Sequence, residues 1–214
     1  MDLRQISIFK NLSDQDLELI KEKNIIEEKI YQKESHIFRV GDLSDSIYYL
    51  IEGSIIVYKI DPNGKRFIIK KIQKPGIFGE VYSYLKEPFD FSAQAEVPSK
   101  ILVIHDFESI FTYGSKEFLK SYIDMLSKKC LELSRTNQIT SQASLRQKIA
   151  KYLLLNQENS LVKIDLSREE WADILSTTRP SLSRELSNMV DDGLIDIRDK
   201  TIEIVNLSQM ADII

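Results

Sequence analysis

The residues best suited to chemistry lie in the stretch from Gly76 to Glu96. Its two ends, Gly79-Glu80 and Ser92-Ala93, resemble the ends of a cradle for a nucleotide phosphate, in which backbone N–H groups and a basic side chain hold the anion. Where the basic side chain would stand, directly before Ser92, the sequence has Phe91. Burying a phosphate without a cation costs several kcal/mol. The stretch therefore predicts a pocket with the shape of a phosphate cradle but without its charge.

The same stretch is rich in aromatic residues, whose role has two interpretations. Tyr82, Tyr84, Phe89 and Phe91 could line a pocket for an apolar or aromatic effector, with a tyrosine hydroxyl orienting it. Alternatively, the rings fill the interior of the domain, and the protein needs no ligand or senses a signal in another way. Lys86 is the only basic residue of the stretch, and its flexible point charge poorly replaces the two-pronged guanidinium of an arginine.

A second group of functional residues lies in the last third of the chain. Ser167 begins a capping box, in which its hydroxyl accepts from the backbone N–H of Glu170 and the Glu170 side chain reaches back. Thr178 is predicted to cap a second helix, with Pro180 in the first turn, where its missing N–H costs nothing. An alternating hairpin that turns near Asp199-Lys200 follows. The pattern predicts a helix-turn-helix with a wing.

The second of these helices has two chemically different faces. Leu182, Leu186 and Met189 occupy one arc and are predicted to face the core. The opposite arc is polar and presents Pro180, Ser183, Arg184 and Ser187, with Arg179 at its edge. Arginine suits the paired acceptors of guanine, and Ser and Thr can contact bases or phosphates, so this face suits a DNA major groove. The predicted DNA contacts are Ser167, Thr178, Arg179, Ser181, Ser183 and Arg184.

The charge of the C-terminal segment limits how it can bind DNA. Residues 145–214 contain nine Lys/Arg against twelve Asp/Glu, a balance of −3. Affinity is therefore expected to rest on a few well-placed groups, doubled by a dimer, rather than on a broad basic surface.

The elements that position the first group are short strands paced by glycines. Gly41, Gly53, Gly64 and Gly76 are separated by 12, 11 and 12 residues, with β-branched and aromatic runs between them. Asn63-Gly64 predicts a hairpin with a type I′ turn, which needs positive φ at both central residues. Regular short strands at this spacing predict a small antiparallel barrel or roll.

Residues 115–144 contain no proline or glycine and predict one long helix. Alternating spacings of three and four form a coiled-coil seam of Ile123, Leu126, Cys130, Leu133, Asn137 and Thr140. This apolar side could simply pack on the roll. A polar residue at a seam position sets the register between paired helices, however, so Asn137 favours pairing with a second chain. The predicted dimer interface is Ile123, Leu126, Cys130, Leu133 and Asn137.

Composition excludes several classes of protein. The 214 residues are 43% hydrophobic, as in an ordinary globular chain. The longest apolar run, Ile47 to Ile51, is far below the ~20 residues that span a bilayer, and the N-terminus lacks the apolar core of a signal peptide. With Cys130 as the only cysteine, an internal disulfide and a four-cysteine iron–sulfur cluster are excluded, and a cytoplasmic location is expected.

The order of these parts resembles the Crp/Fnr family of bacterial transcription regulators, which are related to catabolite activator protein. The resemblance covers nearly the whole chain and is most specific in "IFRVGDLSDSIYYLIEGSIIVYKIDPNGKRFIIKKIQKPGIFGE" and "TTRPSLSRELSNMVDDGLI". It implies an α+β fold with three parts: an N-terminal antiparallel β-roll of the cyclic-nucleotide-binding type (residues 1–114), a dimerisation helix (115–144) and a C-terminal winged helix-turn-helix (145–214). It further implies a homodimer that binds a palindromic promoter site in double-stranded DNA, RNA polymerase as a partner, and a small-molecule effector that reaches the roll.

Carried over residue by residue, the resemblance places a cyclic AMP pocket at Gly79, Glu80, Ser92 and Ala93, where Glu80 would accept from the ribose 2′-OH. Phe91 replaces the arginine that neutralises the phosphate, so cyclic AMP is not expected to bind. The predicted effector pocket, of unidentified ligand, is Gly79, Glu80, Tyr82, Phe91, Ser92 and Ala93.

In the helix-turn-helix, Arg179 and Arg184 match the family's two arginines that contact bases or phosphates. Pro180 stands where many members have a glutamate that reads a base, which is a departure. The loss of this acceptor for the cytosine amino group predicts a half-site different from that of the founding member.

Other functions were weighed against this interpretation. A metal-dependent enzyme needs clustered histidines, and His36 and His105 are isolated; no nucleophile–base pair or phosphate-binding Gly-Lys-Ser/Thr loop is present either. The chain is therefore expected to be no enzyme and to hold no metal or cofactor. Two alternatives stay open: a sensor domain that regulates a protein partner through the winged helix, and a redox sensor that uses Cys130.

Overall fold

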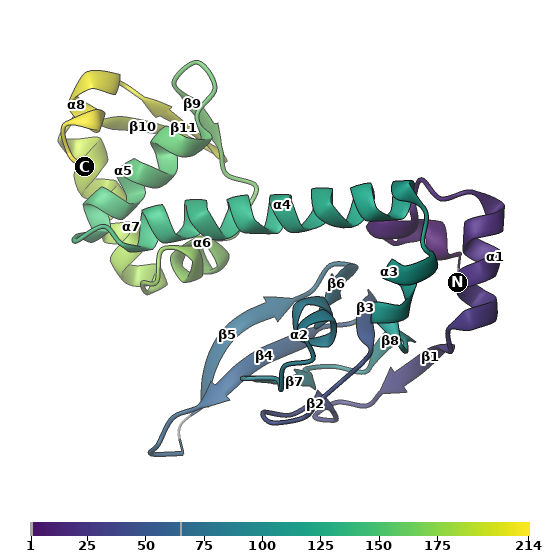
Figure 1. Cartoon of the computed structure of the whole chain (residues 1–214). Coiled ribbons are helices and arrows are strands. Elements are labelled where there is room, and N and C mark those ends of the chain that lie inside the picture. Colours follow the sequence, from purple (N-terminus) through teal and green to yellow (C-terminus); the bar gives the residue numbers. More distant parts are fainter. Residues whose placement is uncertain (1, 65) are drawn as a thin grey trace. The chain divides into compact units, whose positions relative to one another are not determined.

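A computed structural model of the protein describes residues 2–64 and 66–214. The chain divides into two units, the first up to Met125 and the second from Leu126 to Ile214. Figure 1 labels their helices and strands. Among the described residues, no helix combines the length and the apolar character needed to cross a bilayer.

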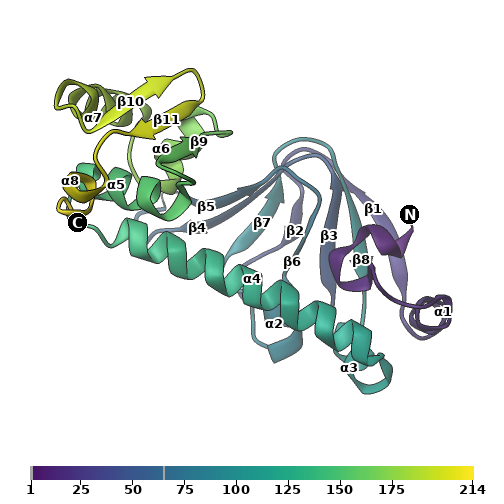
Figure 2. The ribbon, with the colours of Figure 1, turned by 90° about the horizontal axis from the view of Figure 1, so that it is seen from above.

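A roll of two four-stranded antiparallel sheets makes up most of the first unit, as predicted. The strand orders are β1-β8-β3-β6 and β2-β7-β4-β5, and Figure 2 shows β3, β8 and β1 side by side. The inner faces are apolar and enclose a core of aromatic and aliphatic side chains. The strands are β1 (Ile26–Tyr31), β2 (His36–Phe38), β3 (Ile47–Glu52), β4 (Ile55–Ile60), β5 (Arg66–Ile72), β6 (Gly76–Phe78), β7 (Ser92–Ala95) and β8 (Ser99–Ile104).

The predicted hairpin joins β4 to β5, but the prediction of a type I′ turn is wrong. The Gly64 N–H donates to the Asp61 carbonyl at 2.9 Å, which closes a turn over residues 61–64. Of the two residues Asn63 and Gly64, only Gly64 has a positive φ, of 80°. Pro62 explains the difference, because its ring fixes φ near −65° at the first central position of the turn.

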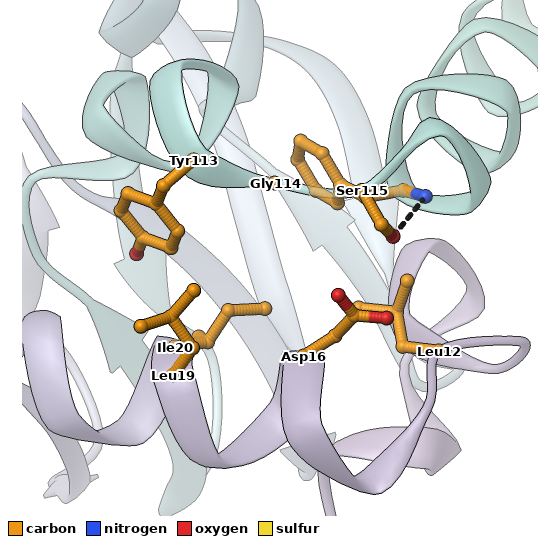
Figure 3. Close-up of a pocket in the computed structure, with 8 residues that line it drawn as sticks. Leu12, Asp16, Leu19, Ile20, Tyr113, Gly114 and Ser115 are labelled. Carbon is orange, nitrogen blue, oxygen red and sulfur yellow. Dashed lines mark hydrogen bonds between the residues drawn. The ribbon is translucent and has the colours of Figure 1, made fainter.

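The α-helices of the first unit are α1 (Asp14–Lys23), α2 (Glu80–Leu85), α3 (Ile110–Tyr113) and the start of α4 (Lys116–Thr140). Short 3-10 helices lie at Leu3–Gln5, Ser7–Phe9 and Phe107–Ser109. The corner between α3 and α4 lies across from α1 (Figure 3). At this corner a side chain on Gly114 would approach the Ile110 carbonyl to 2.4 Å. The hollow between α1 and the corner leaves no room for a water molecule, so these elements pack closely.

The long helix α4 ends four residues earlier than predicted, at Thr140 instead of Ser144. Side chains hydrogen-bond to backbone carbonyls near the end of this helix. The Thr140 hydroxyl donates to the Thr136 carbonyl, and the Gln142 amide donates to the Gln138 carbonyl. Ser144 instead caps the next helix, in a capping box with Gln147. Because the capping box at Ser144 starts α5, helix α4 ends before this residue.

The second unit contains the predicted winged helix-turn-helix. Its elements are α5 (Leu145–Asn156), β9 (Leu161–Lys163), α6 (Arg168–Ile174), α7 (Arg179–Asp191), β10 (Ile195–Arg198), β11 (Thr201–Ile204) and α8 (Leu207–Ala211). The three strands form one antiparallel sheet in the order β10-β11-β9. Trp171 of α6 and the predicted inward stripe of α7 are almost fully buried in one core. The short helix α8, capped by Asn206, was not predicted.

Candidate nucleic-acid interface and effector pocket

Hydroxyl groups begin both helices of the helix-turn-helix. The Ser167 hydroxyl accepts from the Glu170 N–H at 3.2 Å, and the Glu170 carboxylate accepts from the Ser167 N–H at 2.7 Å. The Thr178 hydroxyl accepts from the Ser181 N–H at 3.4 Å and donates to the Ser181 hydroxyl at 3.0 Å. Three of the predicted DNA contacts, Ser167, Thr178 and Ser181, thus fix where α6 and α7 start while remaining exposed.

The other three predicted contacts lie on the exposed side of α7. Ser183 and Arg184 are exposed, and no side chain in the described part of the chain pairs with Arg184. The Arg179 guanidinium lies 3.9 Å from the Glu169 carboxylate, and 62% of its side chain is exposed. Arg184 is therefore an exposed guanidinium whose donors are available to a base or a phosphate.

Acidic neighbours neutralise the nearby basic residues of the sheet. Arg198 of β10 lies 2.8 Å from Asp196 and 3.6 Å from Glu203, and Lys163 of β9 lies 3.2 Å from Asp165. These pairs leave Arg198 and Lys163 beside carboxylates; that a few groups carry the affinity for DNA stays a prediction.

In the roll, Phe91 extends an aromatic core. Phe38 stacks on Phe89 with 3.7 Å between the ring centroids, and Phe91 lies 5.8 Å from Phe38. The Tyr82 ring meets Phe91 edge-on at 5.1 Å. Phe89 is 1% exposed, and Ala93 belongs to the same cluster. The packing favours the interpretation in which the rings fill the interior of the roll.

Tyr84 does not belong to this cluster, so the predicted set of four rings is split in two. Its ring lies 4.7 Å from Phe111 and 6.4 Å from Tyr122. An open hollow of about 380 Å³ lies beside Tyr84 and Phe111, and none of the predicted pocket residues lines it. The reason is the α-helical turn of α2, which directs Tyr82 and Tyr84 to different sides, whereas an extended strand would direct both to the same side.

The remaining predicted pocket residues surround the start of α2 and strand β7. Gly79 caps α2 with φ of 81°, and a side chain there would come within 3.0 Å of the Tyr48 ring. Glu80 is 4% exposed. Burial of the Tyr122 side chain, and then the nearby Glu80 charge, raise the pKa of Tyr122 to about 12. Ser92 is buried and accepts a hydrogen bond from the Val40 N–H at 3.2 Å.

The charge beside Phe91 is held by residues that the sequence did not indicate. The Asp90 carboxylate accepts from the Lys59 ammonium at 2.7 Å and from the Tyr82 hydroxyl at 2.6 Å. Lys59, and to a lesser extent Tyr82, lowers the pKa of Asp90. Burial, and then Asp90, raises the pKa of Tyr82 to about 12, so its hydroxyl stays protonated and donates near neutral pH.

This arrangement leaves little positive charge that could bind a phosphate. Lys59 on β4 is a cation near the loop, but its ion pair with Asp90 has no net charge, so it offers little attraction to an anion. Lys86 is paired with Glu108 at 2.5 Å instead. Both lysines are thus engaged by carboxylates of the same chain.

The two histidines are held by hydrogen bonds within the roll. His36 Nε2 lies 2.8 Å from the Tyr58 hydroxyl, and His105 lies between Glu27 at 2.7 Å and Ser46 at 2.9 Å. Within residues 2–64 and 66–214, no group of three or more His, Cys, Asp or Glu is arranged to hold a metal ion.

The predicted seam of α4 is largely exposed in the single chain. Ile123 is 60% exposed and Leu133 is 71% exposed, and Cys130 and Asn137 are also exposed. Leu126 is half-buried. Four of the five predicted interface residues thus lie on a face that the chain itself leaves open.

Two family profiles match the chain. The profile of the cyclic nucleotide-binding domain matches residues 28–111, and that of the Crp-like helix-turn-helix domain matches residues 147–213. The first match contains the candidate effector pocket, and the second contains the candidate DNA-binding face.

Curated relatives match most of the chain at low identity. The cAMP-activated global transcriptional regulator Vfr of Pseudomonas aeruginosa is 24% identical over 194 residues, which cover 80% of this chain and 86% of Vfr. The cAMP-activated global transcriptional regulator CRP of Escherichia coli is 23% identical over 186 residues, with the same coverage of each chain.

A solved structure confirms the fold. A mutant of CooA from Carboxydothermus hydrogenoformans superposes with a TM-score of 0.62 at 17% identity, covering all of this chain and 96% of the other.

Proposed function

Because the chain belongs to the Crp/Fnr family of bacterial transcription regulators, we propose that it controls transcription as a homodimer bound to a palindromic promoter site. It is a DNA-binding regulator with a cyclic-nucleotide-binding-like domain. The observation that carries the proposal is the exposed polar side of α7, on which Arg184 stands unpaired among the described residues.

Each predicted domain has its own role in the proposed function. Residues 1–114 form the sensor, α4 (Lys116–Thr140) within residues 115–144 is the dimerisation helix, and residues 145–214 form the DNA-binding domain. The exposed apolar side chains on α4 support the pairing of two such helices, because an unpartnered stripe of this kind is unfavourable in water. The dimer acts in the cytoplasm together with RNA polymerase and catalyses no reaction.

At the promoter, Ser167, Thr178, Arg179, Ser181, Ser183 and Arg184 contact DNA. The capping hydroxyls and the first turns of the helices fix the register on the phosphates, and Arg184 reads a base. Two copies related by a two-fold axis then require a two-fold symmetric site.

The sensor differs in chemistry from a pocket for cyclic AMP. Two of the relatives are named as cAMP-activated, whereas here Phe91 fills the position of the phosphate cation and Asp90 engages Lys59, a cation next to it. We infer that the pocket of Gly79, Glu80, Tyr82, Phe91, Ser92 and Ala93 does not bind cyclic AMP. An effector that enters it is apolar or aromatic.

Isothermal titration with cyclic AMP is expected to show no saturable binding up to about 1 mM, because Phe91 stands in place of the phosphate cation and Asp90 engages Lys59 beside it. The same titration with the Escherichia coli relative serves as the positive control. Micromolar binding by this chain, accompanied by a gain in DNA affinity, would contradict the assignment of Phe91.

A further inference from the structure

Arg146 joins α5 to the candidate recognition helix α7. Its Nε donates to the Glu185 carboxylate at 2.6 Å, and its Nη1 donates to the Asp192 carboxylate at 2.6 Å. Arg146 and Glu185 are 34% and 20% exposed in their side chains, so this pair is better shielded from water than an ordinary surface ion pair. Charge-assisted hydrogen bonds of this kind are among the stronger ones in proteins.

Arg146 and Asp192 each interact unfavourably with the dipole of their own helix. Arg146 is the second residue of α5, after the N-cap Ser144, where the helix dipole disfavours a cation. Asp191 and Asp192 stand at the C-terminal end of α7, where the dipole disfavours an anion. Placed against α7, however, the Arg146 cation meets the negative end of that helix. The contact between the helices therefore accounts for residue types that neither helix favours alone.

The two contact points fix the orientation of α7. Glu185 and Asp192 are seven residues apart, which is about two turns, so they share one flank of the helix. The buried stripe of Leu182, Leu186 and Met189 holds α7 on the core, but apolar contacts are not directional. Two directional bonds about two turns apart restrict both the tilt of α7 and its rotation about its axis.

The rotation of α7 matters because it decides which side chains face outward. Arg184 directly precedes Glu185, at about 100° around the helix. When Arg146 holds Glu185, Arg184 lies exposed to solvent. The same contact offsets one of the two negative charges of Glu185 and Asp192, which would otherwise repel the phosphates of a bound duplex.

We propose that Arg146 is the positioning residue of the recognition helix: it sets the rotation of α7 so that Arg184 meets the base edges, and it masks Glu185 and Asp192 from the DNA. The inference rests on the proposed DNA-binding function and adds a residue outside the DNA-contacting set. The Asn188 side-chain amide also donates to the Glu185 carboxylate, at 3.4 Å.

The test compares four variants of the full chain on a duplex recovered by the wild-type protein from random-sequence DNA. Arg146→Gln is expected to lose about tenfold in affinity and to discriminate less between this duplex and one with altered half-site bases. Arg146→Lys keeps the charge but not the two-pronged geometry, so it is expected to regain affinity and not discrimination. Arg146→Gln with Glu185→Gln is expected to regain part of the affinity, because it removes an unpaired carboxylate. Arg198→Gln is the matched control, an arginine held by two carboxylates on the wing.

Hydrogen exchange on the same variants separates positioning from general stability and needs no DNA. Arg146→Gln is expected to speed exchange in peptides of α7 and to leave those of β10 and β11 unchanged, while Arg198→Gln leaves α7 unchanged. Unaltered α7 exchange and discrimination in Arg146→Gln, or a uniform rise over the whole second unit, would overturn the proposal. If the wild-type protein selects no DNA at all, the proposed function fails, and the exchange measurement alone still decides whether Arg146 positions α7.

Discussion

Replacing Arg184 with alanine is expected to abolish binding to the specific site while the dimer stays intact. The guanidinium is exposed on α7, and no other side chain in the described ranges holds it. Loss of a bidentate contact with guanine costs about 1–3 kcal/mol, and a palindrome contains the contact twice. Affinity for the specific duplex should therefore fall by at least about thirtyfold, whereas affinity for unrelated DNA falls much less.

Footprinting and competition gel shifts measure this effect, and sedimentation checks the dimer. Arg39→Ala is the control, since it removes an exposed arginine from the roll and leaves the DNA-binding unit unchanged. An Arg184→Ala protein with an unchanged footprint would remove α7 as the recognition helix.

Replacing Leu133 with glutamate is expected to convert the dimer to monomers and thereby to weaken DNA binding. Leu133 is 71% exposed in the single chain, so the substitution leaves the fold of each chain intact. In a paired seam, two glutamates would face each other without cations, a strongly unfavourable burial of charge. The loss of the second DNA-binding head lowers the affinity for a two-fold site by about 100-fold or more.

Leu131→Glu is the matched control, because Leu131 is 52% exposed on the same helix but lies off the predicted seam. Sedimentation velocity of both variants gives the oligomeric state, and gel shifts on the specific duplex give the affinity. A dimeric Leu133→Glu protein would place the interface elsewhere than on α4.

Local chemistry made much of the second unit predictable. Ser167 and Thr178 cap their helices as predicted, because a helix N-cap depends on residues only three positions apart. The buried stripe of α7 follows in the same way from its helical spacing. By contrast, the turn at Asn63-Gly64 was mispredicted, because the preceding Pro62 competes with the preference of the pair.

What the sequence could not predict depends on contacts between residues far apart in the chain. Lys59 reaches Asp90 across the roll, and Arg146 reaches Glu185 and Asp192 on another helix. No local spacing marks these pairs. The sequence signal for the second pair was that Arg146 starts one helix and Asp192 ends another, because each charge is unfavourable against the dipole of its own helix.

The contact between Lys59 and Asp90 also sharpens the meaning of Phe91. The sequence shows that the phosphate cradle lacks its arginine. In the folded roll, the rings of Phe38 and Tyr82 pack against Phe91, and the nearby Lys59 is paired with the Asp90 carboxylate. The packing favours a roll filled by its own side chains, and the family's architecture is retained around different pocket chemistry.

Selection of binding sites from random-sequence double-stranded DNA tests the central claim most directly. A homodimer with one recognition helix per chain predicts a two-fold symmetric consensus whose half-site centres lie about 10–10.5 base pairs, or a multiple of that, apart. The half-sites should differ from that of the founding member of the family because Pro180 lacks a carboxylate. Failure to enrich any sequence, or enrichment of a single site without symmetry, would contradict a dimeric DNA-binding regulator.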